Sequence, residues 1–219
     1  MSNILGIDEA GRGPVLGPLI LGGVMISNSD EKKLIELGVK DSKLLTNEKR
    51  EFLFERIIEV SKDSKIIKVE PAEIDDVILN SKELNLNWLE AHKSAEIINQ
   101  LKPDVVILDC PHPIPKKYED YVRNLLDNKE IKIICEHKAD FTYPVCSAAS
   151  IMAKVIRERE MDIIKDKYGN TGPGYPSNKV TQKFIGENFD KHPEIFRKSW
   201  KTFQNLVKNK AQKKLNNYE

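Results

Sequence analysis

The sequence has few cysteines, which excludes a disulfide-stapled framework. Its three thiols, an odd number without a CxxC pair, are Cys110, Cys135 and Cys146. This usage is typical of reduced thiols in a cytosolic protein. Cys146 also lacks the local signature of a nucleophile, so we expect it to pack within a helix.

Long hydrophobic runs are absent as well. No apolar stretch approaches the roughly 20 residues of a membrane span. The first residues, MSNILGIDEA, lack the charged segment and long apolar core of a secretory signal. We therefore expect a cytoplasmic protein that does not enter a membrane.

The chain also lacks common nucleotide and zinc motifs. Gly11, Gly13 and Gly17 miss the GxGxxG spacing of a dinucleotide-binding turn, and Pro14 follows where a helix would begin. No GxxxxGK[ST] sequence is present, which argues against a P-loop. The histidines at 112 and 137 have no HExxH-like partner, which argues against zinc.

Net charge is nearly zero, but the charge is unevenly distributed. The 35 basic and 34 acidic residues give +1. Residues 197–219 hold seven Lys or Arg and one acid, so the remainder is net acidic. A solvated helical face is the ordinary explanation of such a basic end. Beside an acidic metal site, it would instead hold a phosphate backbone.

Residues 3–13, NILGIDEAGRG, carry the most informative pattern. The short apolar run 4–7 predicts a buried strand. Asp8 and Glu9 follow it on a turn that contains two glycines and an arginine. Burying unpaired carboxylates costs several kcal/mol, and a bound cation would remove that cost. Glycines let a backbone approach a ligand closely, and arginine suits phosphate.

Periodicity and turn residues predict alternating strands and helices along the chain. We expect strands at 4–7, 18–27, 65–70, 104–109 and 132–136. We expect helices at 30–37, 46–63, from 71, 87–101, 118–126 and 144–167, a loop at 137–143, a glycine-rich loop at 169–178, and basic helices after it. An antiparallel start followed by βαβ units predicts a mixed α/β sheet.

Four acids are candidate metal ligands. Asp8 and Asp109 each end a predicted strand, Glu9 is adjacent to Asp8, and Asp140 lies in the loop before the 144–167 helix. Clustered carboxylates suit Mg²⁺ or Mn²⁺, and two such ions roughly 4 Å apart can catalyse phosphodiester cleavage. Taken singly, each acid could be a turn, cap or surface residue. Consecutive strand residues face opposite sides, so Asp8 and Glu9 share one site only if the strand ends or bulges at Glu9.

Two further residues have open interpretations. Lys43, in the sequence KDSK, is either a solvated loop lysine or a phosphate contact. Tyr175, in GPGYPSN, either folds onto the core or contacts a ligand base or sugar.

Six segments, taken in order, resemble the ribonuclease HII family, particularly its archaeal members. They are IDEAGRGPVLGP, KDSKLL, VILDCP, HKAD, YPVCSAASIMAKV and GPGYPS. The resemblance extends from residue 6 to about 178. It implies a ribonuclease H-like fold, with a five-stranded mixed sheet flanked by helices and a small helical C-terminal segment.

The resemblance also implies an activity. Family members cut the RNA strand of RNA/DNA hybrids and cut at ribonucleotides embedded in duplex DNA. They use Mg²⁺ or Mn²⁺ in a two-metal mechanism that leaves 5′-phosphate and 3′-hydroxyl ends. We therefore expect residues 1–190 to form the catalytic domain and 191–219 a basic segment that aids duplex binding, in a monomer.

Site residues follow from the same resemblance, position by position. The four acids resemble the catalytic metal ligands: Asp8, Glu9, Asp109 and Asp140. The substrate-binding positions resemble residues that sense the ribose 2′-hydroxyl, Gly11, Arg12, Gly13 and Tyr175, and residues that contact phosphate, Lys43 and Ser147.

Two alternatives use the same residues. A junction resolvase would need branched DNA and ignore the 2′-hydroxyl, whereas a hybrid-binding module with a degenerate site would lack activity. The intact set of acids argues against a hybrid-binding module without activity.

Overall fold

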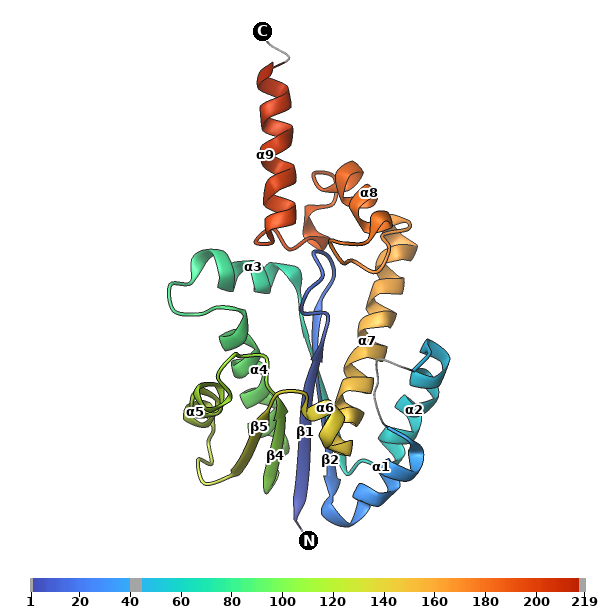
Figure 1. Cartoon of the computed structure of the whole chain (residues 1–219), viewed down its shortest axis with the longest axis vertical. Coiled ribbons are helices and arrows are strands. Elements are labelled where there is room, and N and C mark those ends of the chain that lie inside the picture. The colour runs from blue at the N-terminus through green and yellow to red at the C-terminus, as the bar shows by residue number, and fades with distance from the viewer. Residues whose placement is uncertain (1, 40–44, 217–219) are drawn as a thin grey trace.

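A five-stranded sheet forms the centre of the molecule (Figure 1). The computed structural model describes residues 2–39 and 45–216. The strand order is β3-β2-β1-β4-β5, with β1 in the middle. The strands are β1 (Asn3–Ala10), β2 (Leu19–Ser27), β3 (Asp63–Val69), β4 (Val105–Asp109) and β5 (Lys132–Glu136). The predicted five-stranded mixed sheet is confirmed, because β1, β2 and β3 pair antiparallel whereas β1, β4 and β5 pair parallel.

Helices cover both faces of the sheet (Figure 1). One face carries α3 (Pro71–Asn80), α4 (Leu86–Leu101) and α5 (Pro115–Leu125). The other carries η1 (Asn28–Asp30), α1 (Glu31–Leu37), α2 (Asn47–Val60), α6 (Ala139–Thr142) and α7 (Pro144–Tyr168). Successive strand side chains point to opposite faces and pack into two separate hydrophobic cores, one on each face of the sheet.

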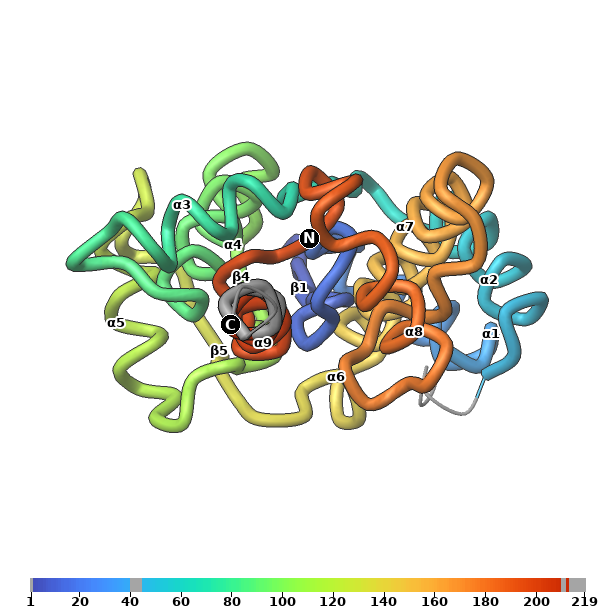
Figure 2. Tube along the Cα trace, turned by 90° about the horizontal axis from the view of Figure 1, so that it is seen from above, coloured from blue at the N-terminus to red at the C-terminus, as the bar shows by residue number. Residues whose placement is uncertain are grey.

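The C-terminal part lies at one end of the sheet. It consists of α8 (Lys179–Asn188), η2 (Pro193–Ile195) and α9 (Lys201–Asn216). A third apolar cluster joins α8 and α9 to Leu16 and to Met161 near the end of α7. Figure 1 shows α9 projecting away from the sheet, and Figure 2 shows it end-on beside the end of β1.

Several predicted boundaries are wrong. β1 does not end at Asp8 but continues to Ala10, because both acids remain paired with β2. The helix predicted to end near Asp63 ends at Val60, and Asp63 begins β3. The helix predicted from 118 begins at Pro115, since proline suits the first helical position. The predicted loop 137–143 contains the short helix α6.

Two helix ends have clear local causes. Thr46 caps α2 by accepting a hydrogen bond from Lys49 N–H. Gly38, with φ +75°, ends α1. None of the helices in the described ranges is long and apolar enough to cross a membrane.

α7 approaches the sheet closely at Gly6. A Cβ on Gly6 would lie 2.4 Å from the carbonyl carbon of Val145, at the start of α7. Only glycine therefore lets α7 pack this closely on β1, next to Asp8.

We predict that Gly6→Ala lowers the free energy of unfolding by about 2–3 kcal/mol, because the backbone of α7 must shift. Gly186→Ala is the matched control. Gly186 is in α8 with open space around it, so alanine there should stabilise by up to about 1 kcal/mol. Chemical denaturation measures both. Equal effects of the two substitutions would contradict the close packing of α7.

Candidate active site

Asp8 and Asp109 lie side by side on the two central parallel strands. Ile7 of β1 is paired in register with Leu108 of β4, so the next residue of each strand is an aspartate. Alternation places both aspartates on the face covered by α7, the same face as Gly6. Asp8 is only 5% exposed.

Asp140 joins them from α6, where it is buried in the first turn. Cys146 of α7 is buried near these three aspartates. Its thiol donates to the Ile107 carbonyl at 3.2 Å. Burial, followed by the charge of Asp8, raises the pKa of Cys146 well above its ordinary value, and Asp109 and Asp140 add to the shift. Cys146 is thus a packed helix residue, as predicted.

Glu9 occupies the opposite face. The strand has no bulge at this point, since Glu9 remains paired with Leu21 of β2. Its carboxylate therefore turns toward α4, on the side where Glu90 of that helix pairs with Arg12 of the following loop. Burial, then the charges of Asp8 and Glu90, raises the pKa of Glu9 well above its ordinary value. Asp109 contributes as well, so the four acids form one electrostatic group that surrounds the end of the central strands.

Hydrogen bonds fix the acids. The N–H of Glu9 donates to Asp8 Oδ1 at 2.7 Å, and the N–H of Ala139 donates to Asp109 Oδ1 at 2.9 Å. The hydroxyl of Ser147 donates to the carbonyl of Asp140 and so joins α6 to α7. Burial, then the charge of Asp109, raises the pKa of Asp8 to about 7. A hydrogen bond with the Ser150 side chain opposes that shift.

The donor set fits a hard divalent cation. All four side chains offer carboxylate oxygens, which Mg²⁺ and Mn²⁺ prefer, and a cation would relieve their mutual repulsion. Across residues 2–39 and 45–216, no three His, Cys, Asp or Glu side chains lie close enough to hold an ion without moving. The fit therefore rests on donor chemistry. The condition stated above for Asp8 and Glu9 to share one site, that the strand end or bulge at Glu9, is not met in this structure.

The glycine–arginine loop, residues 11–13, follows β1 directly. Gly11 has φ +84°, and a Cβ there would lie 2.5 Å from Arg157 Nε. The Arg12 guanidinium, interpreted from sequence as suited to phosphate, instead pairs with Glu90 at 2.9 Å and donates to Asn87 at 2.5 Å. The side chain of Arg12 therefore fixes the loop to α4, which leaves the loop backbone to face a ligand.

Tyr175 lies over Gly13, at 3.6 Å from the position of a Cβ there, and is 42% exposed. Arg157 of α7 holds Tyr175 through a cation–π contact of 5.4 Å and donates to the Pro173 carbonyl at 2.8 Å. The glycine–arginine loop, Glu9 and Tyr175 line a common cavity of about 580 Å³.

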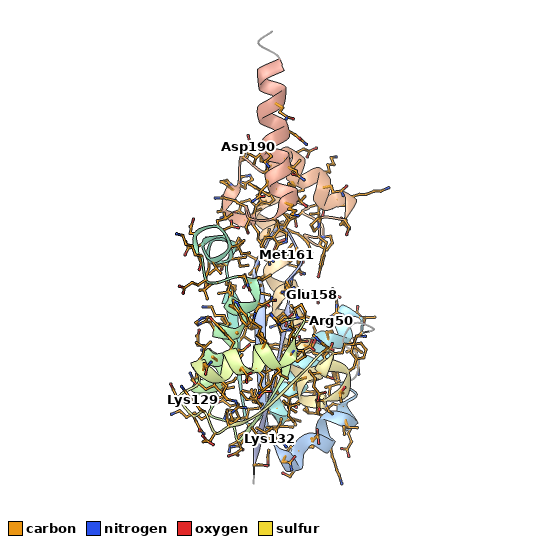
Figure 3. All side chains as sticks on the ribbon, turned by 60° about the vertical axis from the view of Figure 1, so that its left-hand side comes forward. Arg50, Lys129, Lys132, Glu158, Met161 and Asp190 are labelled. Carbon is orange, nitrogen blue, oxygen red and sulfur yellow. The ribbon has the colours of Figure 1, made fainter. Side chains whose placement is uncertain are left out.

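Basic side chains from α2 and α7 form the other wall of this cavity. Figure 3 shows Arg50 of α2 beside Glu158 of α7, an ion pair of 2.6 Å. Further cations lining the cavity are Lys154, Arg157 and Lys165. A cavity that reaches Glu9 and is lined by several cations suits a phosphate backbone.

Lys43, a candidate phosphate contact, lies outside the described residues. Sequence reasoning missed three residues that contact the glycine–arginine loop: Glu90, Arg157 and Arg197. Glu90 is 1% exposed and precedes the buried Ser94 by four residues, so helical spacing was its available signal. Burial raises the pKa of Glu90 to about 7, against the opposing charge of Arg12. No local signal marks the other two.

Comparison with known proteins agrees with this geometry. Residues 5–203 match the family Ribonuclease HII. Ribonuclease HII of Thermococcus sibiricus is 44% identical over 216 residues, covering 96% of this chain and 93% of the relative. The crystal structure of ribonuclease H2 from Pyrococcus horikoshii OT3 superposes with a TM-score of 0.87 at 38% identity, covering 94% of this chain and 98% of the other.

A more distant structure shares the fold alone. It is Bst-RNase HIII in complex with Mn²⁺, with a TM-score of 0.78 at 18% identity, covering 94% of this chain and 69% of the other.

A central mixed sheet with acids at the ends of its neighbouring strands defines a ribonuclease H-like nuclease. The predicted fold is therefore confirmed. The chain belongs to the ribonuclease HII family. It is accordingly an endonucleolytic hydrolase of the ribonuclease H type that acts on nucleic acid.

The pKa of Asp8, raised first by burial and then by the charge of Asp109, predicts a pH-dependent stability. The folded-state pKa of Asp8, about 7, exceeds the model-peptide value of 3.8, so the folded state binds more protons in this window. Stability of the metal-free protein should therefore fall as pH rises through it. In EDTA at about pH 8, we expect Asp8→Asn to raise the melting temperature by about 2–4 °C.

At about pH 5 the gain should be smaller, and it should vanish only below about pH 4, where Asp8 is protonated in both the folded and the unfolded protein. Thermal melts at both pH values make the comparison. A gain of equal size at both would contradict the raised pKa of Asp8.

Proposed function

We propose that this chain cuts the RNA strand of RNA/DNA hybrids and cuts at single ribonucleotides in duplex DNA. The products would carry 5′-phosphate and 3′-hydroxyl ends, and the enzyme would act as a monomer. The observation that carries the proposal is the electrostatic group of four acids directly beside a loop and a tyrosine that line one cavity.

Asp8, Glu9, Asp109 and Asp140 would hold Mg²⁺ or Mn²⁺, in the two-metal arrangement that the family resemblance implies. The Mn²⁺ complex of the more distant Bst-RNase HIII supports a divalent ion. Bound ions would supply a nucleophilic water at neutral pH and stabilise the charge that develops on the departing oxygen.

The protein's own groups would orient the carboxylates and limit the access of water. The N–H groups of Glu9 and Ala139 orient the carboxylates of Asp8 and Asp109. The packing of α7 on β1 excludes water from one side of the acids. These contacts reduce the reorganisation needed when charge builds up in the transition state.

Sugar recognition would come from the cavity side. The backbone of Gly11, Arg12 and Gly13 would contact the ribose 2′-hydroxyl, the group that distinguishes RNA from DNA. The ring of Tyr175 would pack on the neighbouring sugar. Lys43 and Ser147 would contact phosphates, with the Ser147 hydroxyl first released from the Asp140 carbonyl.

Residues 1–190 would form the catalytic domain and 191–219 a segment that aids duplex binding. Lys201 and Lys208 of α9 are exposed, which supports a contact with the duplex backbone.

One assay tests the activity: a labelled duplex with a single ribonucleotide, incubated with Mg²⁺, Mn²⁺ or EDTA. We predict cleavage with either metal and none in EDTA. Asp8→Asn should slow cleavage by at least about a hundredfold, since the metal stabilises the transition state by several kcal/mol. Asp120→Asn, which removes an exposed acid paired with Lys116, is the matched control. Near-normal turnover by Asp8→Asn, or cleavage in EDTA, would overturn the proposal.

A further inference from the structure

Residues of the C-terminal part of the chain donate hydrogen bonds to the backbone carbonyls of the glycine–arginine loop. The buried Arg197, 0% exposed, donates to the carbonyl of Gly11 at 2.6 Å, of Arg12 at 3.0 Å and of Gly17 at 3.0 Å. Trp200 Nε1 donates to the carbonyl of Gly13 at 3.1 Å. All three carbonyls of the loop therefore accept hydrogen bonds from this segment, residues 195–200, which we call the C-terminal clamp.

The clamp is itself firmly anchored. Asp75 of α3 accepts from the N–H of Lys198 and the N–H of Ser199, both at 2.8 Å, and from the Ser199 hydroxyl at 2.6 Å. The Arg197 guanidinium lies 4.9 Å from the centre of the Trp200 ring. Because α3 and the sheet end support it, the clamp can hold the loop in one conformation.

Fixed carbonyls fix the direction of the N–H groups. In a trans peptide the C=O and N–H point in opposite directions. With the Gly11 and Arg12 carbonyls turned toward Arg197, the N–H groups of Arg12 and Gly13 face the other way. Within the described residues, no acceptor binds either N–H. Arg12 and Gly13 both line the cavity that also contains Glu9 and Tyr175.

We propose that Arg197 and Trp200 are positioning residues for sugar selectivity. Arg197 holds the two peptide groups that carry these N–H donors. Trp200 holds the next carbonyl, that of Gly13 before Pro14, and so fixes the end of the loop that keeps both donors directed at the ribose 2′-hydroxyl. This inference rests on the proposed function and deepens it. The C-terminal segment then contributes to the choice of cleavage site as well as to the grip on the duplex.

Trp200→Phe tests the proposal most cleanly. It keeps an aromatic ring beside Arg197, and it removes the donor to the Gly13 carbonyl together with one ring of the indole. The measurement is the affinity for a duplex with one ribonucleotide and for the all-DNA duplex of the same sequence, both in EDTA so that no turnover occurs. We expect the first affinity to fall about fivefold to tenfold, the effect of one lost hydrogen bond, and the second to stay unchanged.

Tyr168→Phe is the control, since it removes a 2.9 Å hydrogen bond to Glu194 near the clamp without touching the loop. It should leave the preference for the ribonucleotide intact. An unchanged preference in Trp200→Phe, or an equal loss of both affinities, would overturn the clamp alone. A wild-type protein with no preference would overturn the proposed function together with the clamp.

Discussion

Concentrated negative charge at the end of the central strands is the constraint on which the rest of the site depends. Asp8, Asp109 and Asp140 influence one another electrostatically on the face covered by α7, and Glu9 adds its charge from the other face of β1. Such a group is costly in a buried position unless a cation joins it. The fold accepts that cost where the parallel strands β1 and β4 end next to each other, and it supports the carboxylates with backbone N–H donors.

The two faces of β1 carry different parts of the site. On the α7 face, close packing at Gly6 and the hydrogen bond to Ser150 hold the aspartates. On the α4 face, Glu9 lies near the ion pair of Arg12 with Glu90, which fixes the loop that follows the strand. In the proposed site, the strand thus carries the metal ligands and the sugar-sensing backbone within a few residues, and the C-terminal clamp holds the loop from the opposite side.

The sequence alone predicted most of the sheet and its antiparallel start, since these follow from local periodicity and turn residues. Asp8 and Asp109 were recognisable because acids directly follow apolar strands. The extension of β1 through Glu9 was missed, because pairing with β2 outweighs the local signal of the acids and glycines. Asp140 was a weaker candidate from its loop position, because its short helix has little local signature, and the family resemblance then matched it to a metal ligand.

The supporting residues were beyond such reasoning. Glu90 and Arg197 look like ordinary charged residues in helical or basic segments, yet each is buried by contacts with a loop 78 or 186 positions away. Only the folded chain shows that these charges are satisfied by a guanidinium in one case and by carbonyls in the other. Long-range contacts of this kind leave no pattern in a single sequence.

The position of a bound metal tests the central claim most directly. Anomalous scattering from crystals grown with Mn²⁺ and a nucleic-acid duplex would locate the ion. The account predicts Mn²⁺ at the end of β1 and β4, bound by carboxylate oxygens of Asp8 and Asp109 with Glu9 or Asp140. Mn²⁺ bound elsewhere, or none at these acids, would contradict it.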